Sequence, residues 1–149
     1  MNRSQSLKQA GQSVWYDNIE RGMLLDGEMA RMVKEGEVYG VTSNPSIFEK
    51  SIRTSAAYDD TLQSMAWAGL SKEQIYLELV REDIQAAADL FLPVYEATDG
   101  IDGMVSVEIN PLLAHETEKS IEDGRALWAQ INRKNVMIKV PATKAGLPV

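Results

Sequence analysis

Cysteine is absent from this sequence, and histidine occurs only once, as His115. Without cysteine the chain can form no disulfide, no thiolate metal site and no cysteine nucleophile. A single imidazole also argues against a histidine-rich zinc centre. The phosphate-binding loop patterns G-x-G-x-x-G and G-x-x-x-x-G-K are missing as well, so nucleotide binding by those loops is unsupported.

Long apolar runs and clustered positive charges are also missing. No stretch approaches the roughly 20 apolar residues of a membrane span, and the N-terminal MNRSQSLKQAGQ lacks the apolar core of a signal peptide. The 15 Lys and Arg residues are outnumbered by 22 Asp and Glu, which gives a formal charge of −7. Phosphate backbones need clustered basic residues, whereas these are scattered. We therefore expect a cytoplasmic location, with no membrane and no nucleic acid as partner.

What is present is the composition of one packed domain. The chain has 149 residues, of which 44% are apolar and 25% are charged, and residues 1–149 are predicted to form a single domain. Short β-branched runs alternate in it with segments of helical periodicity. The predicted strands cover 13–18, 38–44, 104–109 and 136–141; the predicted helices cover 24–36, 45–52, a helical insertion at about 54–99 that Pro93 interrupts, and 117–133.

Alternating strands and helices predict an α/β fold with a parallel sheet, either doubly wound or part of a (β/α)8 TIM barrel. A complete barrel needs about 250 residues, and this chain supplies only about four βα units before it ends. We therefore expect the N-terminal half of a barrel, with the C-terminal half absent.

Strand alternation places polar side chains together. Successive residues of a strand face opposite sides, so Val105, Val107 and Ile109 would share a helix-covered face while Glu108 points the other way. The same rule applied to all four strands turns a polar group near each C-terminal end away from the helices. In a barrel that position is the mouth where active sites lie. The four residues are Asp17, Asn44, Glu108 and Lys139.

Each of these residues also has a simpler structural interpretation. Lys139 and Glu108 would lie about 5 Å apart on adjacent strands and could be simply a buried ion pair with no catalytic role. Asn44, which precedes Pro45, could cap a helix, and Asp17 could be a turn or cap residue. His115 fits a loop or the start of a helix.

The chemical interpretation explains the four polar groups together. A lysine in an apolar strand is disfavoured as an ammonium ion, which leaves its amine free to attack a carbonyl and form a Schiff base. Glu108 and Asp17 could then carry out the proton transfers that imine formation and bond cleavage require. The amide of Asn44 could hold substrate hydroxyls without adding charge.

The motifs around these residues resemble those of a known family. GVTSNPSIF (40–48) resembles the first signature of transaldolases, and VMIKVPATKAGL (136–147) is similar to their second signature, which contains the Schiff-base lysine. The resemblance extends to SVWYDNIERG and VSVEINPLLAHETE and so covers essentially the whole chain. The style is that of the longer bacterial members, and the implied fold is a barrel of the class I aldolase type.

The resemblance implies a role for each matching residue. Lys139 would form the imine with C2 of a ketose phosphate, and Asp17 would take the C4 hydroxyl proton as the C3–C4 bond breaks. Glu108 would act as acid and base through a water. Asn44 would bind the retained dihydroxyacetone unit. Two threonines would line or support the site: Thr42 and Thr143.

The implied activity is a transaldolase reaction of the pentose phosphate pathway. A dihydroxyacetone unit would pass between sugar phosphates, so that sedoheptulose 7-phosphate and glyceraldehyde 3-phosphate give erythrose 4-phosphate and fructose 6-phosphate. No cofactor and no metal are implied. A fructose 6-phosphate aldolase-like enzyme remains an alternative.

The resemblance also implies groups that would lie beyond Val149, among them the arginine that clamps the substrate phosphate. Without it we expect weak binding and impaired activity of this chain. A noncatalytic half-barrel interaction module is therefore a second alternative. Exposed edge strands and an apolar inner surface predict self-association or pairing with a missing C-terminal half.

Overall fold

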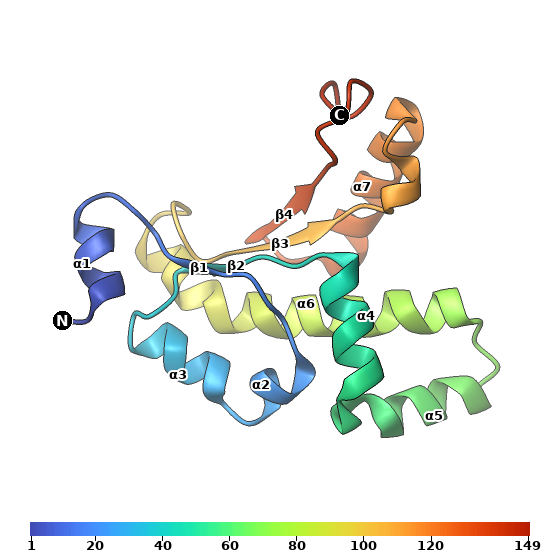
Figure 1. Ribbon diagram of the computed structural model, residues 1–149, viewed down its shortest axis with the longest axis horizontal. Coiled ribbons are helices and arrows are strands. Elements are labelled where there is room, and N and C mark those ends of the chain that lie inside the picture. The colour runs from blue at the N-terminus through green and yellow to red at the C-terminus, as the bar shows by residue number, and fades with distance from the viewer.

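The computed structural model describes residues 1–149. Four short strands lie side by side above a long helix, and shorter helices surround them (Figure 1). The elements in chain order are α1 (Arg3–Gln9), β1 (Trp15–Tyr16), α2 (Arg21–Leu25), α3 (Glu28–Lys34), β2 (Gly40–Val41), α4 (Pro45–Thr54), the 3-10 helix η1 (Ala56–Tyr58), α5 (Asp59–Trp67), α6 (Lys72–Ala97), β3 (Met104–Glu108), the 3-10 helix η2 (Pro111–Leu113), α7 (Thr117–Ile131) and β4 (Val136–Lys139).

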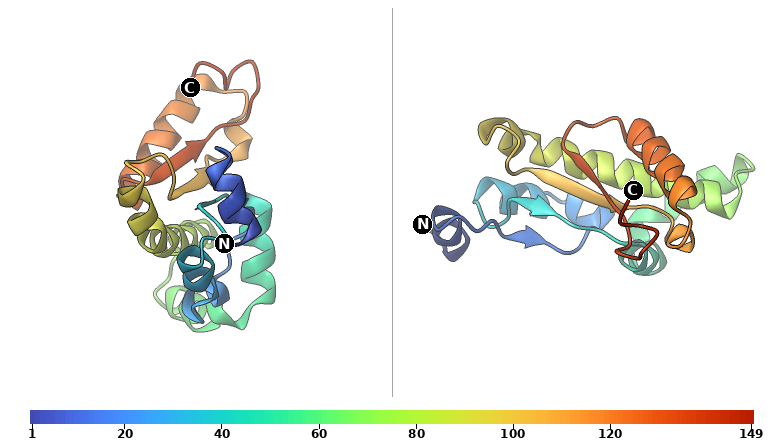
Figure 2. Two further views of the ribbon diagram at one scale, coloured as in Figure 1. Left: turned by 90° about the vertical axis from the view of Figure 1, so that its left-hand side faces the viewer. Right: turned by 90° about the horizontal axis from the view of Figure 1, so that it is seen from above.

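The strands form one parallel sheet in the order β1-β2-β3-β4. Each strand therefore pairs with the next one along the chain, after a helical crossover, which is how consecutive βα units build a barrel wall. The further views in Figure 2 show the same arrangement. β1 and β4 lie at the two edges. The sheet thus matches the predicted partial barrel.

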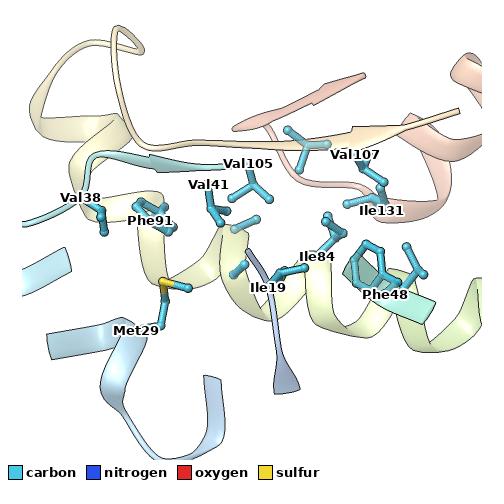
Figure 3. Close-up of a cluster of buried hydrophobic side chains, with 14 residues drawn as sticks. Ile19, Met29, Val38, Val41, Phe48, Ile84, Phe91, Val105, Val107 and Ile131 are labelled. Carbon is cyan, nitrogen blue, oxygen red and sulfur yellow. The ribbon is translucent and has the colours of Figure 1, made fainter. Parts of the chain in front are cut away.

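The core lies between the sheet and its helices. Val41, Val105 and Val107 of the strands belong to one buried cluster with Ile84 and Phe91 of α6 (Figure 3). These are the residues that alternation assigns to the helix-covered face, so that prediction is confirmed. We call the opposite side the open face.

The Trp15 side chain packs on Gly40 and covers part of the open face. A Cβ built on Gly40 would lie 2.5 Å from the Trp15 ring and 3.0 Å from the carbonyl oxygen of Met104. The indole therefore lies directly on the Gly40 backbone, where only glycine fits. Farther along the face, the Met137 side chain is 45% exposed. The open face is therefore only partly covered within this chain.

Several predicted boundaries were wrong. The four strands are shorter than expected, because pairing is limited to two to five residues in each. The single helix predicted at 24–36 is two helices, separated at Gly27, which adopts φ +87. A left-handed residue ends the helical path, and glycine adopts that conformation without steric cost.

The predicted interruption at Pro93 was also wrong. α6 runs through Pro93 to Ala97. Pro93 is exposed, so the carbonyl that loses its amide partner can face water. α1 was not predicted at all, although Asn2 and Gln5 form a capping box at its start. None of these helices has the length and apolar character needed to cross a membrane.

Candidate active site

Lys139 lies at the end of β4, directly opposite Glu108 in the register. Its Nζ is 3.5 Å from Oε2 of Glu108 and donates a hydrogen bond of 3.0 Å to the carbonyl oxygen of Ser43. Since Ser43 follows β2, the lysine side chain crosses β3 on the open face to reach it. The predicted adjacency of the lysine and the carboxylate is therefore confirmed.

The surroundings of this pair differ from both predictions made for it. The side chains of Lys139 and Glu108 are 40% and 20% exposed. The pair is thus not a buried ion pair, and the lysine is not enclosed by an apolar wall. Both groups remain reachable from the open face, which a reacting amine requires.

Asp17 lies just after β1 and is exposed. Thr42 donates its hydroxyl to Oδ1 of Asp17 across 2.5 Å, and the Thr42 amide bonds to the Tyr16 carbonyl oxygen at 2.8 Å. The N-cap of α2 is Glu20. The interpretation of Asp17 as a helix cap is therefore wrong, and its carboxylate has one side-chain partner on the neighbouring strand.

Asn44 is the N-cap of α4, as its structural interpretation predicted. Its Oδ1 accepts a hydrogen bond of 3.0 Å from the Ile47 amide, and Pro45 occupies the first helical position. The side-chain nitrogen of Asn44 makes no hydrogen bond. Capping uses only the oxygen of the amide, so the NH₂ group remains available to a ligand.

Thr143 lies in the loop after β4. Its hydroxyl donates to the Ala114 carbonyl oxygen and accepts from the Gly146 amide at 3.0 Å. Thr143 therefore ties the loop after β4 to the segment between η2 and α7. His115 is exposed in that same segment, as expected for a loop residue.

The structure brings the predicted residues together in two linked groups. Lys139 contacts Glu108 and the Ser43 backbone, while Asp17 contacts Thr42. Thr42 and Ser43 are consecutive, so one short segment after β2 touches both groups. Thr143 stands apart from these contacts.

Two residues near the pair were missed as site candidates. Ser106 is 4% exposed, and its hydroxyl has no hydrogen-bond partner. Alternation places it on the face of Lys139 and Glu108, but serine alone is too common a residue to indicate a site. An unpaired buried hydroxyl is costly, but the oxygen is fully buried, so no substrate group reaches it in this structure.

Tyr76 of α6 is the second missed residue. Burial, and next the negative charge of Glu108, raise the pKa of the Tyr76 hydroxyl above its ordinary value. Tyr76 and Glu108 line a pocket of about 520 Å³, together with Asn44, Phe48 of α4 and Leu127 of α7. Lys139 and Asp17 do not line it. A pocket of this size can hold a small molecule. Its helix-derived walls could not be placed from the sequence.

This arrangement can support covalent carbonyl chemistry. A primary amine, a carboxylate within 3.5 Å of it and a second, exposed carboxylate on the same sheet provide a nucleophile and two proton carriers. The free amide nitrogen of Asn44 adds a neutral group that could bind an oxygen-rich substrate.

Comparison with known proteins gives the same family as the motifs. Residues 14–149 match the model of the family described as transaldolase/fructose-6-phosphate aldolase. The chain is 47% identical to a transaldolase of Thermobifida fusca over 144 residues, and 43% identical to transaldolase 2 of Nostoc sp. strain PCC 7120 over 148 residues. These alignments cover 97% and 99% of this chain but only 39% of each relative.

A third relative shows the same proportions: the transaldolase of Acidothermus cellulolyticus is 45% identical over 142 residues, which are 95% of this chain and 38% of that protein. The chain thus spans well under half the length of the curated relatives it matches. The partial parallel sheet agrees with this coverage. On its fold, its motifs and these matches, the chain belongs to the transaldolase/fructose-6-phosphate aldolase family.

Proposed function

We propose that this chain carries the Schiff-base portion of a transaldolase, a transferase of the pentose phosphate pathway located in the cytoplasm. Sugar phosphates are its proposed substrates. The observation that carries the proposal is the position of the Lys139 amine, 3.5 Å from the Glu108 carboxylate at the ends of adjacent strands. The family match supports it.

The first chemical step uses Lys139 and Glu108. The neutral amine adds to C2 of fructose 6-phosphate, and the carbonyl oxygen becomes the hydroxyl of a carbinolamine. Glu108, acting through a water, donates a proton to that hydroxyl, which leaves as water and gives an iminium ion. The same carboxylate later activates the water that hydrolyses the imine.

The second step uses Asp17. Its carboxylate takes the proton of the C4 hydroxyl, the C3–C4 bond breaks, and the electron pair moves into the iminium to form an enamine. Glyceraldehyde 3-phosphate leaves. The enamine then attacks the aldehyde of erythrose 4-phosphate, Asp17 returns the proton, and hydrolysis releases sedoheptulose 7-phosphate. Thr42 holds the Asp17 carboxylate, and the free amide nitrogen of Asn44 binds a hydroxyl of the retained unit.

The formal charge of −7 gives no general attraction for sugar phosphates. We therefore propose that this chain alone binds its substrates weakly, and that phosphate recognition depends on groups outside residues 1–149. Assays of the chain consequently need millimolar substrate.

Product analysis tests the proposal. The chain is incubated with fructose 6-phosphate and erythrose 4-phosphate, and sedoheptulose 7-phosphate is measured by mass spectrometry beside the Lys139→Met variant. We expect the unmodified chain (the parent) to form sedoheptulose 7-phosphate and the Lys139→Met variant to form none. Equal amounts with parent and variant would contradict the role of Lys139.

A fructose 6-phosphate aldolase is the second candidate, because the matching family covers both activities. An aldolase releases free dihydroxyacetone without an acceptor, whereas a transaldolase retains it on the enzyme. Release that is independent of erythrose 4-phosphate would favour the aldolase. Neither product, together with no covalent adduct, would favour the noncatalytic interaction module.

A further inference from the structure

Arg21 is a buried arginine that the proposed chemistry leaves unused. It begins α2, four residues after Asp17, and is 8% exposed. Its Nε donates to Oδ1 of Asp83 at 2.7 Å, and its Nη2 donates to Oε2 of Glu82 at 2.9 Å and to the Leu79 carbonyl oxygen at 3.4 Å. The guanidinium is thus held by α6, about sixty residues away in the sequence.

Tyr58 closes this network from η1. Its hydroxyl donates to Oδ2 of Asp83 at 2.7 Å and accepts from the backbone amide of Arg21 at 3.1 Å. The Arg21 guanidinium also lies over the Tyr58 ring, 4.7 Å from its centre. Both the main chain and the side chain of Arg21 are therefore fixed.

The charges of this network are costly to bury. Asp83 is 2% exposed, and burial raises the pKa of its carboxyl despite its bonds to Tyr58 and Arg21. A buried ion pair adds little net stability compared with apolar packing, because desolvation offsets the attraction. What such a network does supply is a single geometry, since both partners lose heavily when they separate.

The segment from Asp17 to Arg21 transmits that geometry. Ile19, in its middle, is fully buried in the core, and its carbonyl oxygen accepts a bond of 3.1 Å from the Ser51 hydroxyl. Asp17 itself is exposed and has only Thr42 as a hydrogen-bond partner. The direction of its carboxylate therefore depends on this one hydrogen bond and on the backbone at both sides of Asp17, namely Tyr16 paired with β2 and the segment that ends at Arg21.

We propose that Arg21, held by Asp83 and Tyr58, is a positioning residue that aims the Asp17 carboxylate at the substrate. This inference rests on the proposed function for the role of Asp17. Arg21 touches no substrate and acts only through the backbone between the two residues.

Borohydride trapping separates the step that uses Asp17 from the step that uses Lys139. Reduction after incubation with fructose 6-phosphate leaves a six-carbon adduct on Lys139 if only the imine has formed, and a three-carbon adduct if the C3–C4 bond has also broken. In Arg21→Lys we expect the ratio of three-carbon to six-carbon adduct to fall by about 10- to 100-fold, because a misplacement of about 1 Å costs that much. Total adduct should change little.

Two further variants sharpen this result. Tyr58→Phe removes a single hydroxyl from the network and should lower the ratio by a smaller factor, which keeps the test usable if Arg21→Lys folds poorly. Arg31→Lys is the matched control, because Arg31 pairs with Glu35 and Glu37 on the surface and should leave the ratio unchanged. A fall in total adduct at a constant ratio would overturn the proposal.

Amide hydrogen exchange tests the anchoring without any reaction. In Arg21→Lys the Thr42 amide, bonded to Tyr16 beside Asp17, should exchange about tenfold faster. The Ile109 amide, bonded to Lys139, should keep its protection. Equal acceleration at both amides, or none at Thr42, would overturn the proposal. Local acceleration without any Lys139 adduct would instead count against the proposed function.

Discussion

Asn44 combines two uses in one side chain. Its oxygen caps α4, while its nitrogen is free. Asn44→Asp preserves the capping oxygen but removes the amide donor, whereas Asn44→Ala removes both. We expect Asn44→Asp to keep the stability of the parent and to weaken fructose 6-phosphate binding, and Asn44→Ala to lose about 1 kcal/mol of unfolding free energy as well. Urea unfolding and adduct yield at varied substrate concentration measure the two effects.

The outcome that would contradict a binding role is equally specific. If Asn44→Asp traps substrate as well as the parent at every concentration, then Asn44 only caps α4.

Asp17 permits a prediction about a single chemical step. Asp17→Asn keeps the shape of the side chain, and its amide oxygen can still accept the hydrogen bond from the Thr42 hydroxyl. An amide cannot, however, take the proton of the C4 hydroxyl. We expect cleavage of fructose 6-phosphate to slow by about 10²- to 10⁴-fold while the six-carbon adduct on Lys139 still forms. Quenched-flow sampling with borohydride measures both.

Loss of imine trapping together with cleavage in Asp17→Asn would give Asp17 a role in binding or folding instead.

At the residue scale, alternation was enough to find the polar strand ends. Lys139 and Glu108 are opposite each other because their strands are neighbours, and neighbouring strands follow from βα order. Arg21 and Asp83 could not be paired in this way, because 62 residues separate them and each lies on a helix. Only the packing of α2 against α6 brings them together.

At the element scale, the sequence predicted whether a segment is a helix or a strand better than it predicted where each element begins and ends. Ser71 and Gln74 form a capping box at the start of α6, and the three-residue spacing of these two residue types indicates such a start. Its continuation through Pro93 depends on solvent exposure of that turn, which the sequence does not specify. The break at Gly27 depends on a left-handed backbone angle, and glycine permits such an angle without requiring it.

Tyr58 of η1 donates a hydrogen bond to Asp83 of α6, and this contact should make the unfolding free energy of the chain depend on pH. Burial, and next the charge of Asp83, raise the pKa of the Tyr58 hydroxyl above its ordinary value of 10.0. Above that pH the unfolded chain releases the proton while the folded chain retains it, so the unfolding free energy falls as the pH rises. Tyr58→Phe should reduce this slope by up to about 1.4 kcal/mol per pH unit.

Urea unfolding of the parent and Tyr58→Phe at several values between about pH 9 and 11 measures the two slopes. Equal slopes would show that Tyr58 ionises alike in the folded and unfolded chains.

At the scale of the whole molecule, the sheet is open. Both β1 and β4 are edge strands, and Met137 is exposed on the open face. Unpaired edges and exposed apolar surface favour association, so we expect this chain to self-associate. Met137→Glu should weaken association by at least about tenfold, since burying a methionine is worth about 1.5–3 kcal/mol. Sedimentation velocity measures the change.

Leu112→Glu is the matched control for this experiment, because Leu112 is 85% exposed and lies on η2, outside the sheet. A parent chain that stays monomeric, or equal effects of the two substitutions, would show that the open face does not mediate association.

The most direct test of the whole account is covalent trapping at Lys139. The chain is incubated with millimolar fructose 6-phosphate and borohydride, digested and analysed by mass spectrometry. The account predicts a reduced dihydroxyacetone adduct on the peptide containing Lys139 and none in Lys139→Met. An adduct that persists in Lys139→Met on another lysine, such as Lys144, or no adduct on Lys139 of the parent, would contradict it.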